Sequence, residues 1–216
     1  MDYILVFSKK IIYIYTMAIA IITADVVNSR AHQPQLWMTH LKTILGTFGS
    51  TPQQWEIYRG DSFQLEITPQ HALYAAVVIK AHLKRTANLD LRIAIGIGDK
   101  TYTSETVTSS NGTAFINSGM CFESLKKNLL AIKTDHNDLD ETLNLMFYLA
   151  SFTFNNWTQI TAQLTEHALT HPKQNQKQLA SHFKTTQGNI SQSLKRSGYD
   201  ELKALITYYE SKTKVI

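Results

Sequence analysis

The chain has 216 residues, enough for one large domain or two smaller ones with real hydrophobic cores. A hydrophobic share of 44% and a charged share of 18% are ordinary for a soluble globular protein. The single cysteine, Cys121, excludes an intramolecular disulfide and favours a reducing compartment, which we expect to be the cytoplasm.

The net charge of +4 is distributed unevenly along the chain. From His171 onward there are eight Lys/Arg and three Asp/Glu, whereas the preceding part has thirteen and fourteen. This asymmetry predicts a separate basic module near the C-terminus that faces nucleic acid.

The N-terminal region is apolar. The run 11–22 is shorter than the roughly 20 apolar residues that a membrane-spanning helix needs, and we expect no membrane partner. As a signal peptide it would have only a weak cleavage site, at Ala18 and Ala20. We interpret 19–24 as a buried strand; residues 1–16 are expected to be an extension from an upstream start codon, an extra edge strand or a disordered tail.

The next patterns predict a β-α-β-β-α-β series in an α/β (α+β), ferredoxin-like fold. After the first strand, they indicate a helix over 33–48, hairpin strands over 55–58 and 63–67, a helix over 69–83 and a strand over 91–97. A loop over 98–113, a helix over 114–128, a strand over 129–133 and a helix over 139–154 follow. We therefore expect a first domain over 17–155 and a helical module over 156–216.

Two aspartates end apolar strand patterns. Asp25 follows the first strand, and Asp61 lies in the turn of the hairpin. Because the third strand of this topology is antiparallel to the first, the two carboxylates should lie side by side, where they repel unless a cation intervenes. Oxygen ligands suit Mg²⁺ or Mn²⁺ together with a nucleotide phosphate. The alternative is that Asp61 only shapes the turn and Asp25 caps the next helix.

Three stretches in order, IITADVVNSR (21–30), YRGDSFQ (58–64) and LRIAIGIG (91–98), resemble the palm of class III nucleotide cyclases and GGDEF enzymes. From Ala18 to the C-terminus, the chain resembles the SatD-like family, small bacterial proteins with a cyclase-like palm and a helical tail. The resemblance implies a palm in which Asp25 and Asp61 bind two metal ions.

The match to an active cyclase is incomplete. Asn117 fills the place of the cyclase asparagine at the transition state, but Cys121 stands where an arginine is expected. The position of the cyclase lysine that reads the purine corresponds to about Ile57, so that lysine is also missing. A thiol cannot stabilise phosphate charge as a guanidinium does, so the resemblance favours a palm that binds a nucleotide without cyclising it. Arg59 and Arg92 are the candidate replacements for the missing cation.

Two further sites are weaker. His167 and His171 have the H-x-x-x-H spacing of zinc ligands on one helical face, but no third ligand is evident and Pro172 follows directly. We interpret them as a polar helix end. Cys121 lies within a helical apolar pattern, and we interpret it as a core residue.

Residues 176–196 fit the helix-turn-helix pattern. The residues expected to form the core between the two helices are Leu179, Ala180, Phe183, Ile190 and Leu194. Lys184 occupies the turn position where glycine is usual, and Thr186 is expected to cap the second helix. The side chains predicted to contact DNA are Thr186, Gln187, Asn189, Ser191, Gln192, Lys195 and Arg196.

These patterns predict a cytoplasmic, homodimeric transcriptional regulator that binds DNA and senses a nucleotide or metal ion with a degenerate palm. One alternative is a divergent nucleotidyl cyclase or related palm enzyme that uses two metal ions. Another is a non-catalytic adaptor in which the palm only dimerises and the helical module binds protein.

Overall fold

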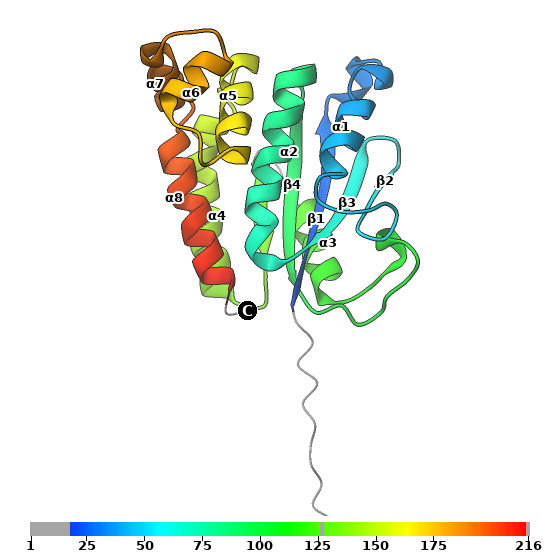
Figure 1. The fold of residues 1–216 in the computed structure, drawn as a ribbon. Helices are drawn as coiled ribbons and strands as arrows, with labels where there is room; N and C mark the ends of the chain where they lie inside the picture. The colour runs from blue at the N-terminus through cyan, green and yellow to red at the C-terminus, as the bar shows by residue number, and fades with distance from the viewer. Residues whose placement is uncertain (1–17, 126–127, 215–216) are drawn as a thin grey trace, which may run out of the picture.

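A computed structural model describes residues 18–125 and 128–214, and the expected N-terminal extension lies outside them. Within these residues, a five-stranded sheet has the strand order β2-β3-β1-β4-β5 (Figure 1). The strands are β1 (Ile19–Val27), β2 (Trp55–Tyr58), β3 (Ser62–Ile67), β4 (Asp90–Gly98) and β5 (Leu130–Lys133). The helices are α1 (Met38–Leu45), α2 (Ala72–Ala87), α3 (Thr113–Ser124), α4 (Asn137–Phe154), α5 (Gln159–Thr170), α6 (Gln176–His182), α7 (Gln187–Arg196) and α8 (Tyr199–Thr213).

The mixed α/β class and the β-α-β-β-α-β order of the first elements are confirmed. β1 pairs antiparallel with β3, as expected, and also antiparallel with β4, whereas β5 runs parallel to β4. The helix expected over 33–48 is shorter, because a 3-10 turn at Pro34–Leu36 precedes α1. That turn places Leu36, which we expected on the apolar helix face, in solvent with 60% of its surface exposed.

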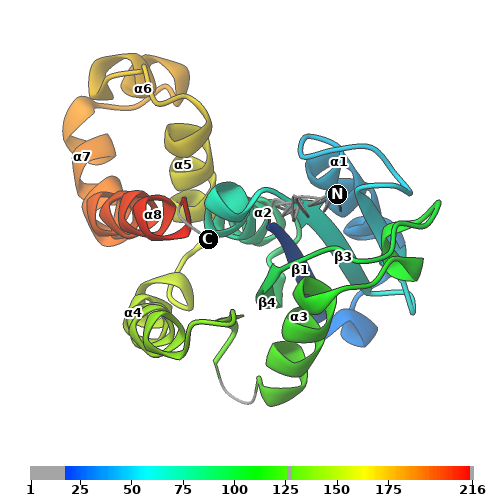
Figure 2. The same cartoon turned by 90° about the horizontal axis from the view of Figure 1, so that it is seen from below.

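Alternate residues of β1 pack against helices on opposite faces of the sheet. Ala20, Ile22 and Ala24 belong to the main core together with residues of α1 and α2. Ile21 packs on the other face against residues of α3 and the preceding loop. Figure 2 shows α3 on the side of the sheet opposite α2. A Cβ at Gly96 of β4 would meet backbone atoms of α3 at 2.2 and 2.3 Å, so a glycine is needed for this close approach.

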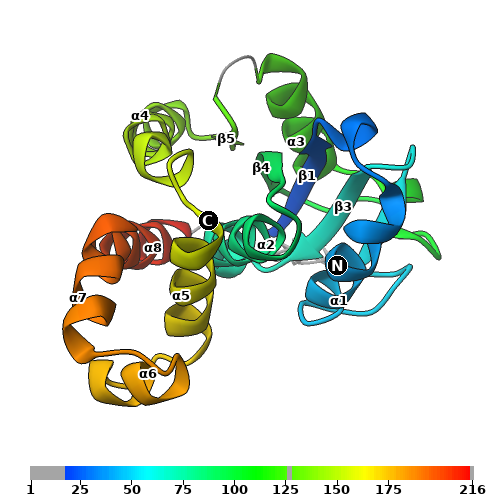
Figure 3. The same cartoon turned by 90° about the horizontal axis from the view of Figure 1, so that it is seen from above.

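The helical module shares the main core with the sheet. Trp157, Leu202, Ile206 and Tyr209 are buried in the same cluster as the strand residues. α5 packs along α2, and α8 packs near α4 (Figures 1 and 3). α5 and α8, which flank α6 and α7 in the chain, are therefore fixed to the rest of the molecule through apolar contacts.

α4 covers the free edge of β5. The Asn144 side chain accepts a hydrogen bond from the Ile132 N–H and donates one to the Ile132 carbonyl, both at 2.9 Å. The Asp140 carboxylate accepts from the Thr134 N–H at 2.9 and 3.0 Å. These bonds satisfy backbone groups that would otherwise be open to pairing with another chain. Across residues 18–125 and 128–214, no helix combines the length and apolarity needed to cross a membrane.

Candidate functional site

The hairpin turn brings Asp61 beside the end of β1. Three residues connect β2 to β3, because Tyr58 pairs with Ser62, and two of them, Arg59 and Gly60, have positive φ of 52° and 87°. Asp25 lies opposite Ser62 in the β1–β3 register, and the Val26 N–H donates to the Asp61 carbonyl at 3.1 Å. The two aspartates thus lie at the same end of the sheet, as the topology predicted.

A guanidinium provides the positive charge at this end of the sheet. Arg92 is the β4 partner of Asp25, and its Nε donates to Asp25 Oδ1 at 2.9 Å while Nη2 donates to Oδ2. The hydrogen bonds to Asp25 raise the pKa of Arg92, and the negative charge of Asp61 adds to this effect. The guanidinium also lies 5.1 Å from the centre of the Phe122 ring. Asp25 is therefore held by a bidentate ion pair.

The same contacts limit metal binding in this arrangement. Both Asp25 oxygens accept hydrogen bonds from Arg92, and Asp61 Oδ2 accepts one from the Ser29 hydroxyl. The carboxylates are suitable ligands for Mg²⁺ or Mn²⁺, and Arg92 competes with such an ion for the lone pairs of Asp25. In the part of the chain that the structure describes, no three or more His, Cys, Asp or Glu side chains are grouped so as to hold a metal ion.

Asn117 lies far from the two aspartates within the chain. Its side chain is buried, and Nδ2 donates to the Ile97 carbonyl at 2.9 Å and to Asp135 Oδ1 at 3.2 Å. Ile97 pairs with Ala20, five residues before Asp25 on β1, which is roughly 16 Å along a strand. The structure therefore does not bring Asn117 and the aspartates into one site of a single chain.

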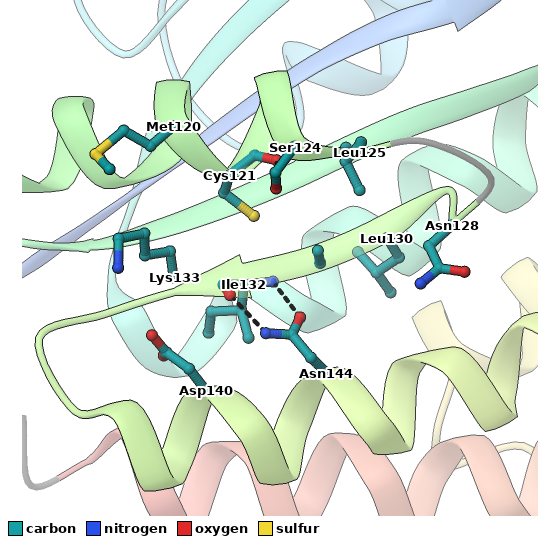
Figure 4. A pocket seen from close by; sticks show the side chains of 11 residues that line it. Met120, Cys121, Ser124, Leu125, Asn128, Leu130, Ile132, Lys133, Asp140 and Asn144 are labelled. Atoms are coloured by element: carbon teal, nitrogen blue, oxygen red, sulfur yellow. Dashed lines mark hydrogen bonds between the residues drawn. The ribbon is translucent and has the colours of Figure 1, made fainter.

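Cys121 lines a cavity of about 680 Å³ between α3, β5 and α4 (Figure 4). Lys133, Asp140 and Asn144 also line it, and Asn144 makes its two hydrogen bonds to the backbone of Ile132 in β5. Burial, with a smaller contribution from the Asp140 charge, raises the pKa of the Cys121 thiol to about 12. A thiol that is protonated at neutral pH is a poor nucleophile, and the core position predicted for Cys121 is confirmed.

The helix-turn-helix core has the composition that the spacing predicted. Leu179, Ala180, Ile190 and Leu194 are buried together, and Phe183 packs on them while partly exposed. Two residues of α5 complete this core, Leu164 and Ala168, which sequence reasoning did not include. The contact depends on how α5 crosses the pair, and no local spacing signals it.

The turn and the cap between α6 and α7 are also as predicted. Lys184 has a φ of 50°, the left-handed conformation that favours glycine at this position. The Thr186 side chain accepts a hydrogen bond from the Asn189 N–H at 3.2 Å, which caps the N-terminus of α7. At the start of α6, Asn175 and Gln178 form a reciprocal capping box.

α7 presents a polar, acid-free surface. Every side chain predicted to contact DNA is exposed: Thr186, Gln187, Asn189, Ser191, Gln192, Lys195 and Arg196. From Gln176 to Arg196 the chain has four Lys/Arg and no Asp/Glu. α6 and α7 lie on the side of the molecule away from the sheet (Figures 2 and 3), so the sheet does not cover this surface.

The geometry divides the α7 surface into two faces. Asn189, Gln192 and Arg196 line a groove of about 570 Å³ beside α5. Gln187 and Lys195 do not line this groove. The Asn189 Nδ2 already donates to the Thr185 hydroxyl at 3.0 Å, so part of its hydrogen-bonding capacity is used within the chain.

A stack of three histidines lies at the end of α5. The rings of His167 and His171 are stacked with their centroids 4.1 Å apart. The ring of His182, from α6, also stacks on His167, with a centroid distance of 4.2 Å. Burial lowers the pKa of His167, with the charges of His171 and His182 adding to the effect. Zinc ligands direct their nitrogen lone pairs at one central ion. Stacked, nearly parallel rings do not converge in this way, so the arrangement differs from a zinc site. Sequence reasoning missed His182, because its contact arises from the packing of α6 on α5.

No protein-family model matches the chain, and a search of curated proteins finds no significant match. What the chain does must therefore be inferred from the acidic end of the sheet and from the surface of α7.

Proposed function

We propose that the chain is a transcriptional regulator that binds DNA with α7. The observation that carries this proposal is the exposed, acid-free surface of α7, fixed on the core formed with α5 and α6. An exposed helix of this kind, preceded by a tight turn and a capped N-terminus, is the arrangement that enters the major groove.

The residue types along α7 suit different parts of a DNA site. Gln187, Asn189 and Gln192 carry amides, which can donate to and accept from the edge of an adenine. Lys195 and Arg196 lie in the last turn, where cations contact phosphates and release counterions. Base contacts thus come from the first turns of α7, and phosphate contacts from its end.

We further propose that the sheet and its helices form a ferredoxin-like, nucleotide cyclase-like palm, as in the SatD-like family. The order β2-β3-β1-β4 and the position of Asp25 and Asp61 at one strand end support this. In such a palm Asp25 and Asp61 would hold Mg²⁺ or Mn²⁺, which neutralises phosphate charge when bound. Arg92, released from Asp25, and Arg59 would then contact the phosphates of a nucleotide. In the present structure, the bidentate pair supplies hydrogen-bond partners to Asp25 and Arg92 that a metal ion and a nucleotide would otherwise provide.

α5 provides a path from the palm to the DNA-binding surface. Its Glu166 is held by α2, where His82 Nδ1 lies 2.8 Å from Oε1 and Arg85 Nε donates to Oε2. Its Leu164 and Ala168 belong to the helix-turn-helix core. We infer that a change in the position of α2 would reach α6 and α7 through α5.

The geometry favours this regulator over a divergent cyclase. Asn117 is engaged at the other end of β4, and the Cys121 thiol is neutral and buried. Neither is placed to stabilise phosphate charge beside Asp25 of the same chain.

Fluorescence anisotropy of the full chain with duplex DNA at several salt concentrations tests the proposal. We expect the binding constant to fall steeply as the salt concentration rises. The slope of its logarithm against the logarithm of salt concentration should be smaller by about one unit in Lys195→Ala than in the unmodified chain. Lys203→Ala removes the same charge from an exposed position of α8 and is the matched control. Absence of binding at low salt would leave the adaptor alternative, in which the helical module contacts protein.

A further inference from the structure

The outer face of α4 exposes four large apolar side chains. Leu145, Tyr148, Leu149 and Phe152 have 60%, 47%, 59% and 63% of their surfaces exposed, and together we call them the α4 stripe. No charged residue occurs from Thr142 to Phe154. A surface helix normally carries polar and charged side chains on its solvent face, so a continuous apolar face marks an interaction site.

The stripe cannot turn inward, because the other faces of α4 are already engaged. Leu143, Phe147 and Phe154 are buried in the main core. Asn144 is bonded to both backbone groups of Ile132 in β5. The helix lies at the periphery of the molecule (Figures 2 and 3), and Tyr148 and Phe152 pack edge to face with ring centroids 5.8 Å apart. The stripe is thus a preorganised surface on a fixed helix.

We propose that the α4 stripe binds the α4 stripe of a second copy of this chain, with the two helices antiparallel. The spacing of the four positions is three, one and three residues, which reads the same in both directions along the helix. About a two-fold axis through the middle of the stripe, Leu145 faces the partner's Phe152 and Leu149 faces the partner's Tyr148. Each contact joins one leucine to one aromatic ring and is repeated with the two copies exchanged, as a two-fold interface requires.

The charges at the start of α4 favour the antiparallel orientation. Asp138 and Glu141 lie in the first turns, and both are exposed. Parallel helices would bring these acids against the same acids of the partner, whereas antiparallel helices keep them at opposite ends of the interface. Antiparallel helices also oppose their macrodipoles.

The area of the stripe is sufficient for a moderate dimer. Two half-exposed aromatic rings and two leucines present roughly 400 to 500 Å² per copy, since an aromatic side chain covers about 150–250 Å² when fully buried. Two copies would bury close to the roughly 1,000 Å² that a specific interface needs. An apolar groove of about 510 Å³ between α4 and α8 continues this surface from Leu149. An interface of this size is at the lower end for specific complexes, so we expect a reversible dimer.

The proposal does not depend on DNA binding, although a two-fold dimer would present two copies of α7. Sedimentation equilibrium of the full chain between about 1 and 100 μM tests it directly. We expect a monomer–dimer equilibrium that Leu149→Glu weakens at least about tenfold, because a central contact is replaced by a buried charge. Leu36→Glu changes an equally exposed leucine, 60% against 59%, outside the stripe and should leave the equilibrium unchanged. Circular dichroism and the melting temperature verify that both variants are folded.

Cysteine cross-linking tests the orientation. Antiparallel helices predict a disulfide between Leu145→Cys and Phe152→Cys chains mixed together, and none from either variant alone. The natural Cys121 is 4% exposed and does not compete. A disulfide of Leu145→Cys with itself would indicate parallel helices and overturn the proposal. It would also be overturned by a chain that stays monomeric at 100 μM, or by a dimer that survives Leu149→Glu. A chain that dimerises only after residues 1–17 are removed would overturn it as well, since those residues would then be the occupant of the stripe.

Discussion

Asp25 on β1 and Arg92 on β4 face each other across the ladder and form a bidentate ion pair at the end of the sheet where Asp61 also lies. Arg92 thus takes the position that a bound cation would take beside the carboxylates. The pair is both a stabilising contact and a competitor for any metal ion that approaches Asp25.

Removing this competitor should strengthen metal binding. We expect Arg92→Gln to bind Mn²⁺ about tenfold more tightly than the unmodified chain, because the bidentate ion pair, worth about 1.5 kcal/mol at this part-exposed site, no longer has to be broken. Arg59→Gln removes the same charge from the neighbouring turn without breaking that pair, and should have a smaller effect. Isothermal calorimetry measures both. Equal affinities in all three chains, or binding that persists in Asp25→Asn, would show that this site does not hold the ion.

The chain should not cyclise ATP or GTP. Asn117 donates to Ile97 at the other end of β4, and Cys121 provides no charge where a cyclase uses a guanidinium, a donor typically worth about 10²–10³ in rate. Chromatography of the nucleotides after incubation with Mn²⁺ measures this. Robust cyclic nucleotide production that Asp25→Asn abolishes would contradict the prediction and favour the enzyme alternative.

The contact between α2 and α5 should be important for stability. Glu166→Ala leaves Arg85 and His82 without their shared acceptor in a largely buried site, at a cost of about 3 kcal/mol in the free energy of unfolding. Glu141→Ala, which removes an exposed carboxylate from α4, should change it by less than about 0.5 kcal/mol. Urea denaturation measures both values, and similar losses in the two variants would refute the role assigned to Glu166.

The histidine stack should make the chain less stable in mild acid. Burial lowers the pKa of His167 in the folded chain, so the unfolded chain binds more protons below its ordinary pKa of about 6.5. Stability should therefore be complete above that pH and decrease as the pH falls from about 7 to 5. Urea midpoints at the two pH values measure the decrease. His182→Asn removes one stacked imidazole and should reduce it, whereas His32→Asn, at an exposed site, should not.

The residues of α7 should divide into two functional groups. Gln187→Ala is expected to cost about 1–3 kcal/mol on the preferred DNA site and little on unrelated duplexes. Arg196→Ala should weaken binding to every duplex by a similar factor. Anisotropy with a preferred and a scrambled duplex separates the two behaviours. Equal losses for Gln187→Ala on both duplexes would place this residue outside base recognition.

Local spacing predicted much of this architecture, since its contacts lie close in sequence. The core around Leu179 and Ile190, the strained turn at Lys184 and the Thr186 cap all follow from positions within 21 residues. The proximity of Asp25 to Asp61 followed from topology alone.

Other contacts depend on how distant elements pack, and sequence patterns do not encode them. Three contacts are of this kind: the hydrogen bonds of Asn144 to β5, the contact of Glu166 with His82 of α2, and the stacking of His182 on His167. The pairing of Arg92 with Asp25 requires the exact β1–β4 register, which a strand pattern fixes only to within a residue or two. Leu36 was misplaced because a 3-10 turn, not an α-helix, begins at Pro34.

Selection of duplexes from a randomised DNA library by the full chain tests the central claim most directly. We predict that a defined sequence is enriched, that it binds the full chain with steep salt dependence, and that Gln187→Ala loses the enrichment while remaining folded. A library that shows no enrichment, together with no DNA binding at low salt, would contradict a DNA-binding role for α7.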